Sequence, residues 1–230
     1  MKLLLFDIDQ TLINTGGAGL RALDRACRKM FALENAMGGI SPHGKTDPAI
    51  VREIFRVKLH SSNPTDSQIA SVIENYVFFL RDEVRTSATY RVLPGIASLL
   101  TQLSQREDIY LGLATGNVEV GARIKLDRGE LNLFFTFGGF GSDSEDRMAL
   151  VRKAAQKVAD KSGGEVDSSN TFVIGDTPLD IDAGKRCGFK TVGVATGSYS
   201  VDQLLACGAT FAVSDFAAQR DYFLRSTFME

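Results

Sequence analysis

The N-terminal stretch Leu3–Thr11, LLLFDIDQT, constrains the fold of this chain more than any other segment. Its first four residues are apolar, which is typical of a strand buried on both faces of a parallel sheet. Asp7 and Asp9 follow directly, and side chains at positions i and i+2 of an extended chain point to the same side. We therefore expect both acids at the carboxyl end of a buried strand, where open α/β sheets bind ligands. Two acids this close need a cation or a shared proton to neutralise them.

The rest of the chain divides into a helical part and an alternating part. Between about residues 16 and 88, apolar residues recur at helical spacing, and no convincing strand is present. From residue 91 onward strands and helices alternate, with buried strands expected at 109–114, 134–137, 171–174 and 191–194. This order predicts an α/β fold with a Rossmann-like parallel sheet formed by residues 1–15 plus 89–230. Residues 16–88 are expected to form an all-helical domain inserted after the first strand.

Polar clusters follow the expected strands. They are Asp7 and Asp9, then Thr115, Gly116 and Asn117, then Asp176 with Asp180, and finally Arg147 after a Gly-rich loop. In a parallel sheet these strand ends meet along one edge. Carboxylates there can hold Mg²⁺, whereas Thr115 and backbone N–H groups at a helix N-terminus can bind an anion. A metal site beside an anion site suits phosphoryl transfer.

Composition and charge exclude several classes of function. The net charge of −2 comes without a basic run, so neither nucleic acid nor a membrane surface is an expected partner. No apolar stretch approaches the length of a membrane span. The three cysteines have no paired spacing and fit free thiols, so we expect a cytoplasmic location. With only two histidines, any metal should be oxygen-liganded, such as Mg²⁺.

The motifs and their order resemble those of the haloacid dehalogenase superfamily, in the phosphoglycolate phosphatase-like branch with a helical cap. Asp7–Thr11 resembles the first motif of that family, Leu113–Asn117 the second and Gly175–Asp180 the fourth. The resemblance covers essentially the whole chain. It implies a Mg²⁺-dependent phosphatase that acts on a small phosphorylated metabolite, as a monomer or a homodimer.

The resemblance also implies roles for individual residues. Asp7 would be the nucleophile and form an aspartyl-phosphate, and Asp9 would protonate the leaving alcohol and then activate water. Asp7, the main-chain carbonyl of Asp9 and Asp176 would hold Mg²⁺. Asp180 would be a ligand through water or would hold the ligands in place. Thr115, Gly116 and Asn117 would bind the phosphoryl group.

The third motif departs from the family pattern. The family usually has a lysine at the start of the helix after the Gly-rich loop, and this chain has Arg147 there. Arginine is always charged and can bond phosphate through two N–H groups, so the role can survive. The alternative is a surface arginine, with Lys153 or no residue in that role. In the inserted domain, Lys45 lies in a Gly-containing loop that could lean over the site and contact substrate; otherwise it is a solvated loop lysine.

Other functions remain open at this point. A 2-haloacid dehalogenase of the same family needs neither a second aspartate in the first motif nor a metal, so Asp9 argues against it. A sugar phosphomutase shares the motifs and differs only in transferring the phosphoryl group to a second substrate. A phosphonate hydrolase would need a Schiff-base lysine in the cap. A non-enzymatic binding module is disfavoured by the complete set of acids.

Overall fold

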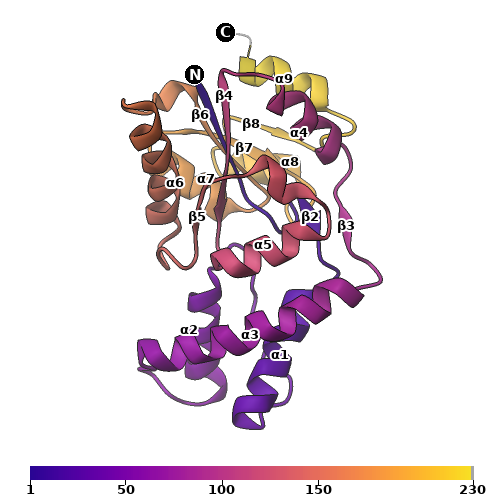
Figure 1. Cartoon of the computed structure of the whole chain (residues 1–230), viewed down its shortest axis with the longest axis vertical. Coiled ribbons are helices and arrows are strands. Elements are labelled where there is room, and N and C mark those ends of the chain that lie inside the picture. Colours follow the sequence, from indigo (N-terminus) through magenta and orange to yellow (C-terminus); the bar gives the residue numbers. More distant parts are fainter. Residues whose placement is uncertain (229–230) are drawn as a thin grey trace.

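The computed structural model describes residues 1–228, with the backbone only at residue 162, and has a parallel sheet at its centre (Figure 1). The sheet is six-stranded, in the order β5-β4-β1-β6-β7-β8. In that order the strands are Gly138–Phe140, Ile109–Thr115, Lys2–Phe6, Thr171–Gly175, Lys190–Val194 and Phe211–Val213. Every pairing between neighbours is parallel, and β1 lies between β4 and β6. The carboxyl ends of these three strands therefore adjoin at one edge, which confirms the predicted α/β fold.

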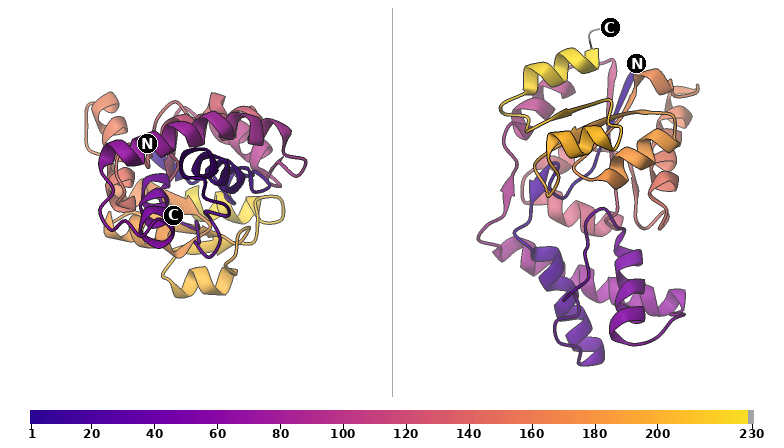
Figure 2. Two further views of the ribbon diagram at one scale, coloured as in Figure 1. Left: turned by 90° about the horizontal axis from the view of Figure 1, so that it is seen from below. Right: turned by 180° about the vertical axis from the view of Figure 1, so that it is seen from behind.

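Helices cover both faces of the sheet (Figure 1, Figure 2). On one face lie α4 (Ile96–Ser104), α5 (Glu119–Asp127) and α9 (Arg220–Phe228); on the other lie α6 (Arg147–Ser162), α7 (Pro178–Arg186) and α8 (Val201–Ala206). The side chains of the central strand β1 pack against both layers of helices. Leu4 and Phe6 join the hydrophobic cluster of the first face, whereas Leu3 and Leu5 join that of the second. This alternation follows from strand geometry, and it explains why β1 has an unbroken apolar sequence.

The helices α1 (Ala18–Phe31), α2 (Asp47–Lys58) and α3 (Asp66–Thr86) form a separate layer below the sheet in Figure 1. We call these helices and the loops between them the cap. The cap has its own hydrophobic cluster, in which apolar side chains such as Cys27, Phe55 and Leu80 pack together. Two connections join it to the sheet, and in them β2 (Ile13–Asn14) pairs antiparallel with β3 (Arg91–Val92). The expected helical insert after the first strand is confirmed, while its boundaries at residues 16 and 88 stay a prediction.

The prediction of a strand at residues 134–137 is wrong. Residues Leu131–Phe134 form a short 3₁₀ helix, η1, and the strand begins only at Gly138. Its glycines have a packing reason, because a Cβ on Gly139 would lie 1.7 Å from the Leu150 carbonyl oxygen of α6. A second 3₁₀ helix, η2 (Ser168–Asn170), precedes β6.

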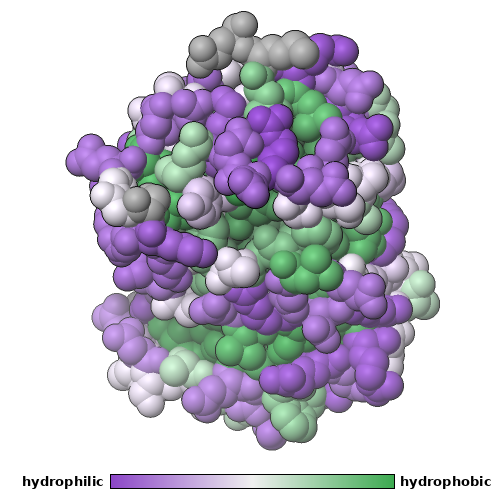
Figure 3. Space-filling view, turned by 45° about the horizontal axis from the view of Figure 1, so that its top comes forward, coloured by the Kyte–Doolittle hydropathy of each residue, from purple (hydrophilic) through white to green (hydrophobic). Residues whose placement is uncertain are grey.

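The surface is mixed in character. On the face shown in Figure 3, hydrophilic residues surround smaller apolar patches. Two strongly exposed apolar side chains, Phe78 and Leu133, lie on different elements, α3 and η1. Among the helices of residues 1–228, none is both long and apolar enough to cross a membrane.

Candidate active site

A cavity of about 180 Å³ lies between the carboxyl edge of the sheet and the cap. Of the residues that the sequence singles out, those that line it are Asp7, Asp9, Lys45, Thr115, Gly116, Asn117, Arg147 and Asp176. Asp180 lies beside this set and is bonded to Arg147. Leu20, Leu23, Ile50 and Tyr76 line it from the cap. The fold thus brings the predicted site residues to one place, and the wall opposite them combines these apolar side chains with the polar side chains of His43, Lys45 and Asp47.

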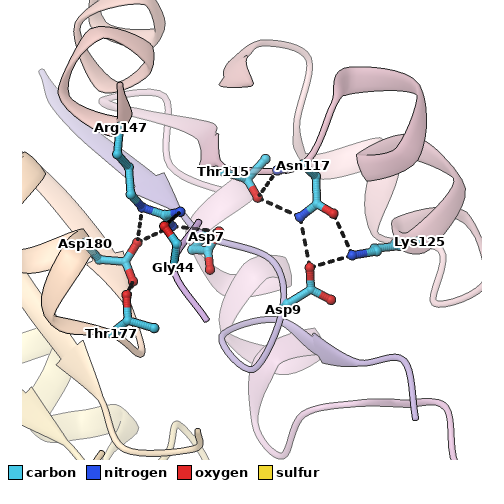
Figure 4. Close-up of polar contacts among 9 residues, drawn as sticks. All are labelled: Asp7, Asp9, Gly44, Thr115, Asn117, Lys125, Arg147, Thr177 and Asp180. Atoms are coloured by element: carbon cyan, nitrogen blue, oxygen red, sulfur yellow. Dashed lines mark hydrogen bonds and ion pairs between the residues drawn. The ribbon is translucent and has the colours of Figure 1, made fainter. Parts of the chain in front are cut away.

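Asp7 and Asp9 both line this cavity, as their spacing predicts, but their carboxylates contact different partners (Figure 4). Asp7 faces Arg147 on the side of α6. Asp9 turns toward Asn117 and Lys125, on the side of α5. The site therefore consists of two adjacent charge clusters.

Arg147 organises the first cluster. It is the first residue of α6, and its side chain is only 10% exposed and turned into the site, so the surface alternative is wrong. Its Nη2 lies 3.1 Å from Asp7 Oδ1, and its Nε donates to Asp180 Oδ1 at 3.0 Å. Nη1 donates to the main-chain carbonyl of Gly44 in the cap at 3.0 Å. One guanidinium thus joins two acids of the core to a loop of the cap.

The acids of this cluster exceed the positive charge beside them. Carboxylate oxygens of Asp7, Asp176 and Asp180 lie within 4.8 Å of one another, and all three residues are buried. Burial raises the pKa of Asp7 to about 6, against the opposing effect of Arg147. Burial, together with Asp180 and Asp7, raises the pKa of Asp176 to about 9. Such crowding of oxygen donors suits a divalent cation, so these residues could hold a metal.

Asp180 takes a supporting place within this group. Its Oδ2 accepts hydrogen bonds from the backbone N–H of Thr177 at 3.0 Å and from the hydroxyl of Thr177 at 2.7 Å. Its Oδ1 accepts from Arg147. Both oxygens are therefore already bonded within the protein, which fits a residue that holds the others in place.

The second cluster contains a residue that we did not predict, Lys125 of α5. Its ammonium donates to Asp9 Oδ2 at 2.6 Å and to Asn117 Oδ1 at 2.5 Å. The Asn117 amide donates to Asp9 Oδ2 and to the Thr115 hydroxyl, each at 2.9 Å. The only signal for Lys125 in the sequence is its position, because it shares one face of α5 with Ala122 and Leu126 at helical spacing; nothing local indicates its partners.

The sequence matches a known family. The profile of haloacid dehalogenase-like hydrolases matches residues 4–194. The chain belongs to this family. The "Probable phosphatase IndB" of Dickeya dadantii (strain 3937) is 24% identical to this hydrolase over 216 residues, covering 94% of this chain and 90% of that protein.

Two solved structures have the same fold as this hydrolase. A predicted phosphatase from Clostridium acetobutylicum superposes with a TM-score of 0.75, at 18% identity, and covers 97% of this chain and 98% of its own. A predicted phosphoglycolate phosphatase from Haemophilus somnus gives a TM-score of 0.71, also at 18% identity and with coverages of 97% and 98%. At such identity these structures establish the fold alone.

The loop before α2 brings the cap of this hydrolase onto the core. The N–H of Asp47 donates to the Gly116 carbonyl at 2.8 Å, and its carboxylate accepts the N–H of Val118 at 2.9 Å. A Cβ on Gly116 would lie 2.3 Å from the Lys45 carbonyl oxygen, so the glycine permits this approach. Thr46 is the capping residue of α2, and Asp47, the first residue of the helix, is buried against the core.

Lys45 itself lies at the edge of the cavity. Its ammonium is 2.5 Å from Glu53 Oε2 of α2, and its side chain is one-third exposed. A contact with substrate stays a prediction for this residue.

Proposed function

We propose that this chain is a Mg²⁺-dependent phosphatase that hydrolyses a small phosphomonoester through an aspartyl-phosphate on Asp7. The observation that carries the proposal is the separation of the two acids of the first motif. Asp7 lies in the crowded acid cluster beside Arg147, whereas Asp9 lies apart from it on the same cavity. One acid is thus placed for attack on phosphorus and the other for proton transfer. Family membership supports the assignment.

The reaction would proceed in two steps. A carboxylate oxygen of Asp7 attacks phosphorus, the bond to the alcohol oxygen breaks, and Asp9 gives its proton to that oxygen. Water then attacks the phosphorus of the aspartyl-phosphate while Asp9, now ionised, takes the water's proton. The bond from phosphorus to Asp7 breaks, phosphate leaves, and both acids return to their starting states. Thr115, the backbone N–H groups of Gly116 and Asn117, and Arg147 would bind the phosphoryl oxygens.

The metal would be held by Asp7, the main-chain carbonyl of Asp9 and Asp176, with Asp180 keeping Arg147 and the ligands in place. The ion, when bound, would neutralise charge on the phosphoryl oxygens. The oxygen donor set and the raised pKa of both Asp7 and Asp176 support the assignment of a cation to this place.

The substrate would be small, because the cavity measures about 180 Å³. Leu20, Leu23 and Ile50 would contact the carbon part of the substrate, and Lys45 would contact a polar group at the edge. We place the chain in the phosphoglycolate phosphatase-like branch. The likeness to the Haemophilus somnus protein supports this placement at the level of fold.

The test measures release of phosphate from p-nitrophenyl phosphate and from a panel of phosphorylated metabolites that includes phosphoglycolate. Activity should vanish in EDTA and return with Mg²⁺, and Asp7→Asn should abolish it in a folded protein. Asp182→Asn, an exposed acid on α7, is the matched control and should behave as wild type. Full activity in EDTA would exclude the metal, and a near-normal kcat in Asp7→Asn would exclude the nucleophile.

A further inference from the structure

Lys125 is a buried cation for which the mechanism above has no use. Its side chain is 6% exposed, whereas that of its partner Asp9 is 40% exposed and reaches the cavity. Lysine is almost never fully buried unless it is paired. Its partner here is Asp9, the residue assigned to proton transfer. We therefore expect the lysine to act through Asp9.

Lys125, Asn117 and Asp9 form a closed ring of hydrogen bonds (Figure 4). The lysine donates to both of the others, and the Asn117 amide donates to Asp9. Among the described residues, both hydrogen bonds to the Asp9 carboxylate go to Oδ2. The ring therefore fixes the rotation of the carboxylate and leaves Oδ1 available for exchange of a proton.

We propose that Lys125 is a positioning residue that, together with Asn117, holds Asp9 so that Oδ1 meets the leaving oxygen of the substrate. This inference rests on the proposed function, in which Asp9 transfers that proton. Lys125 keeps its own proton throughout. Burial alone would lower its pKa, but its polar neighbours, the Asp9 carboxylate first among them, outweigh burial, and the pKa is raised.

The lysine is also surrounded from the cap. Tyr76 of α3 interacts with it through its hydroxyl, and Asp47 of α2 contributes a nearby carboxylate. A Cβ on Gly19 of α1 would lie 3.7 Å from both the Lys125 ammonium and the Tyr76 hydroxyl. The cation that orients Asp9 is thus held by core and cap together.

Positioning of Asp9 can be separated from a purely structural role by changing the leaving group. The kcat/KM value reports the steps up to formation of the aspartyl-phosphate, in which Asp9 protonates the leaving oxygen. Phenyl phosphate and p-nitrophenyl phosphate have nearly the same shape. Phenolate is the poorer leaving group and depends on that proton, whereas p-nitrophenolate leaves readily without it.

The experiment compares Lys125→Met with wild type on both esters in Mg²⁺. We expect kcat/KM for phenyl phosphate to fall about 10²-fold, the scale of general acid catalysis, and that for p-nitrophenyl phosphate to fall far less. Asp9→Asn should show the same selective loss. Lys153→Met, which replaces an exposed lysine of α6, should change neither value.

An equal loss on both esters, or no loss, would overturn the proposal. Because Lys125→Met leaves Asp47 and Tyr76 without a cation, it may be replaced by Lys125→Gln if it does not fold, with the same criterion. A wild-type protein that hydrolyses neither these esters nor any phosphorylated metabolite of the panel would instead overturn the proposed function. An active wild type whose Lys125 variants lack the selective loss overturns only the role of Lys125.

Discussion

The buried carboxylate of Asp47 should make the stability of this protein fall as the pH rises through the weakly acidic range. Asp47 belongs to the cap but is buried against the core, where it accepts the N–H of Val118. Burial raises its pKa from 3.8 to about 6, although Lys125 and the Val118 N–H act in the opposite direction. The perturbation that isolates this effect is Asp47→Asn, because the amide oxygen can still accept the same hydrogen bond.

The sign and the magnitude follow from proton binding. In the folded protein Asp47 keeps its proton to a higher pH than in the unfolded chain, so the folded state binds more protons between about pH 4 and 6. Stability conferred by the neutral form is present below the unfolded pKa and is lost as the pH rises through the folded one. A rise from 3.8 to about 6 corresponds to about 3 kcal/mol of unfolding free energy. Relative to wild type, Asp47→Asn should gain about this amount between pH 4 and pH 7.

The assay is urea unfolding of the metal-free wild type and the variant at several pH values. Asp7 and Asp176 titrate in both proteins, so their contributions cancel in the difference. Asp167→Asn supplies a control of opposite sign, because hydrogen bonds from Ser169 and Asn170 lower the pKa of Asp167. That variant should lose stability relative to wild type as the pH rises. A difference curve for Asp47→Asn that is flat, or that falls with pH, would refute the reasoning.

Three further predictions concern the site. Arg147→Ala should lower kcat by 10²-fold or more and destabilise the fold by about 3–5 kcal/mol, because it leaves two buried acids without their cation; Lys153→Ala, measured beside it, should do neither. Lys45→Ala should raise KM for the natural substrate and leave that for an aryl phosphate unchanged, and equal effects would place Lys45 outside the substrate site. Gly116→Ala should lower both the melting temperature and kcat/KM, because its methyl carbon would lie 2.3 Å from the Lys45 carbonyl oxygen. Wild-type values would show that the cap loop can move aside at no cost.

The parts of this fold that could be predicted from the sequence are those with a local cause. The strands β1, β4 and β6 are short apolar runs that end in polar residues, and such runs are typical of strands in a buried parallel sheet. The strand β5 could not be predicted in this way. Its glycines look like a loop locally, and their reason is the backbone of α6, which packs against Gly139.

The same distinction between local and tertiary causes explains why the roles of Lys125 and Asp47 were not predicted from the sequence. Lys125 is a lysine on a short helix, and such a residue is usually solvated. Its burial depends on Asp9, 116 positions earlier in the chain, and on cap residues that only the tertiary fold brings close. Asp47 is a similar case, because its carboxylate binds the N–H of Val118, 71 positions later. Contacts at that separation leave no periodic pattern in the sequence.

The arginine in the third motif has a geometric reason in this chain. The guanidinium bonds the Asp180 carboxylate through Nε, approaches Asp7 through Nη2 and reaches the Gly44 carbonyl of the cap through Nη1. A lysine would offer one compact ammonium, which could balance the charge of Asp7 but could not span these three directions. Each acid of the first motif thus has its own cation from a core helix, Arg147 for Asp7 and Lys125 for Asp9. Since both cations also contact the cap, the charge around each acid depends on where the cap lies.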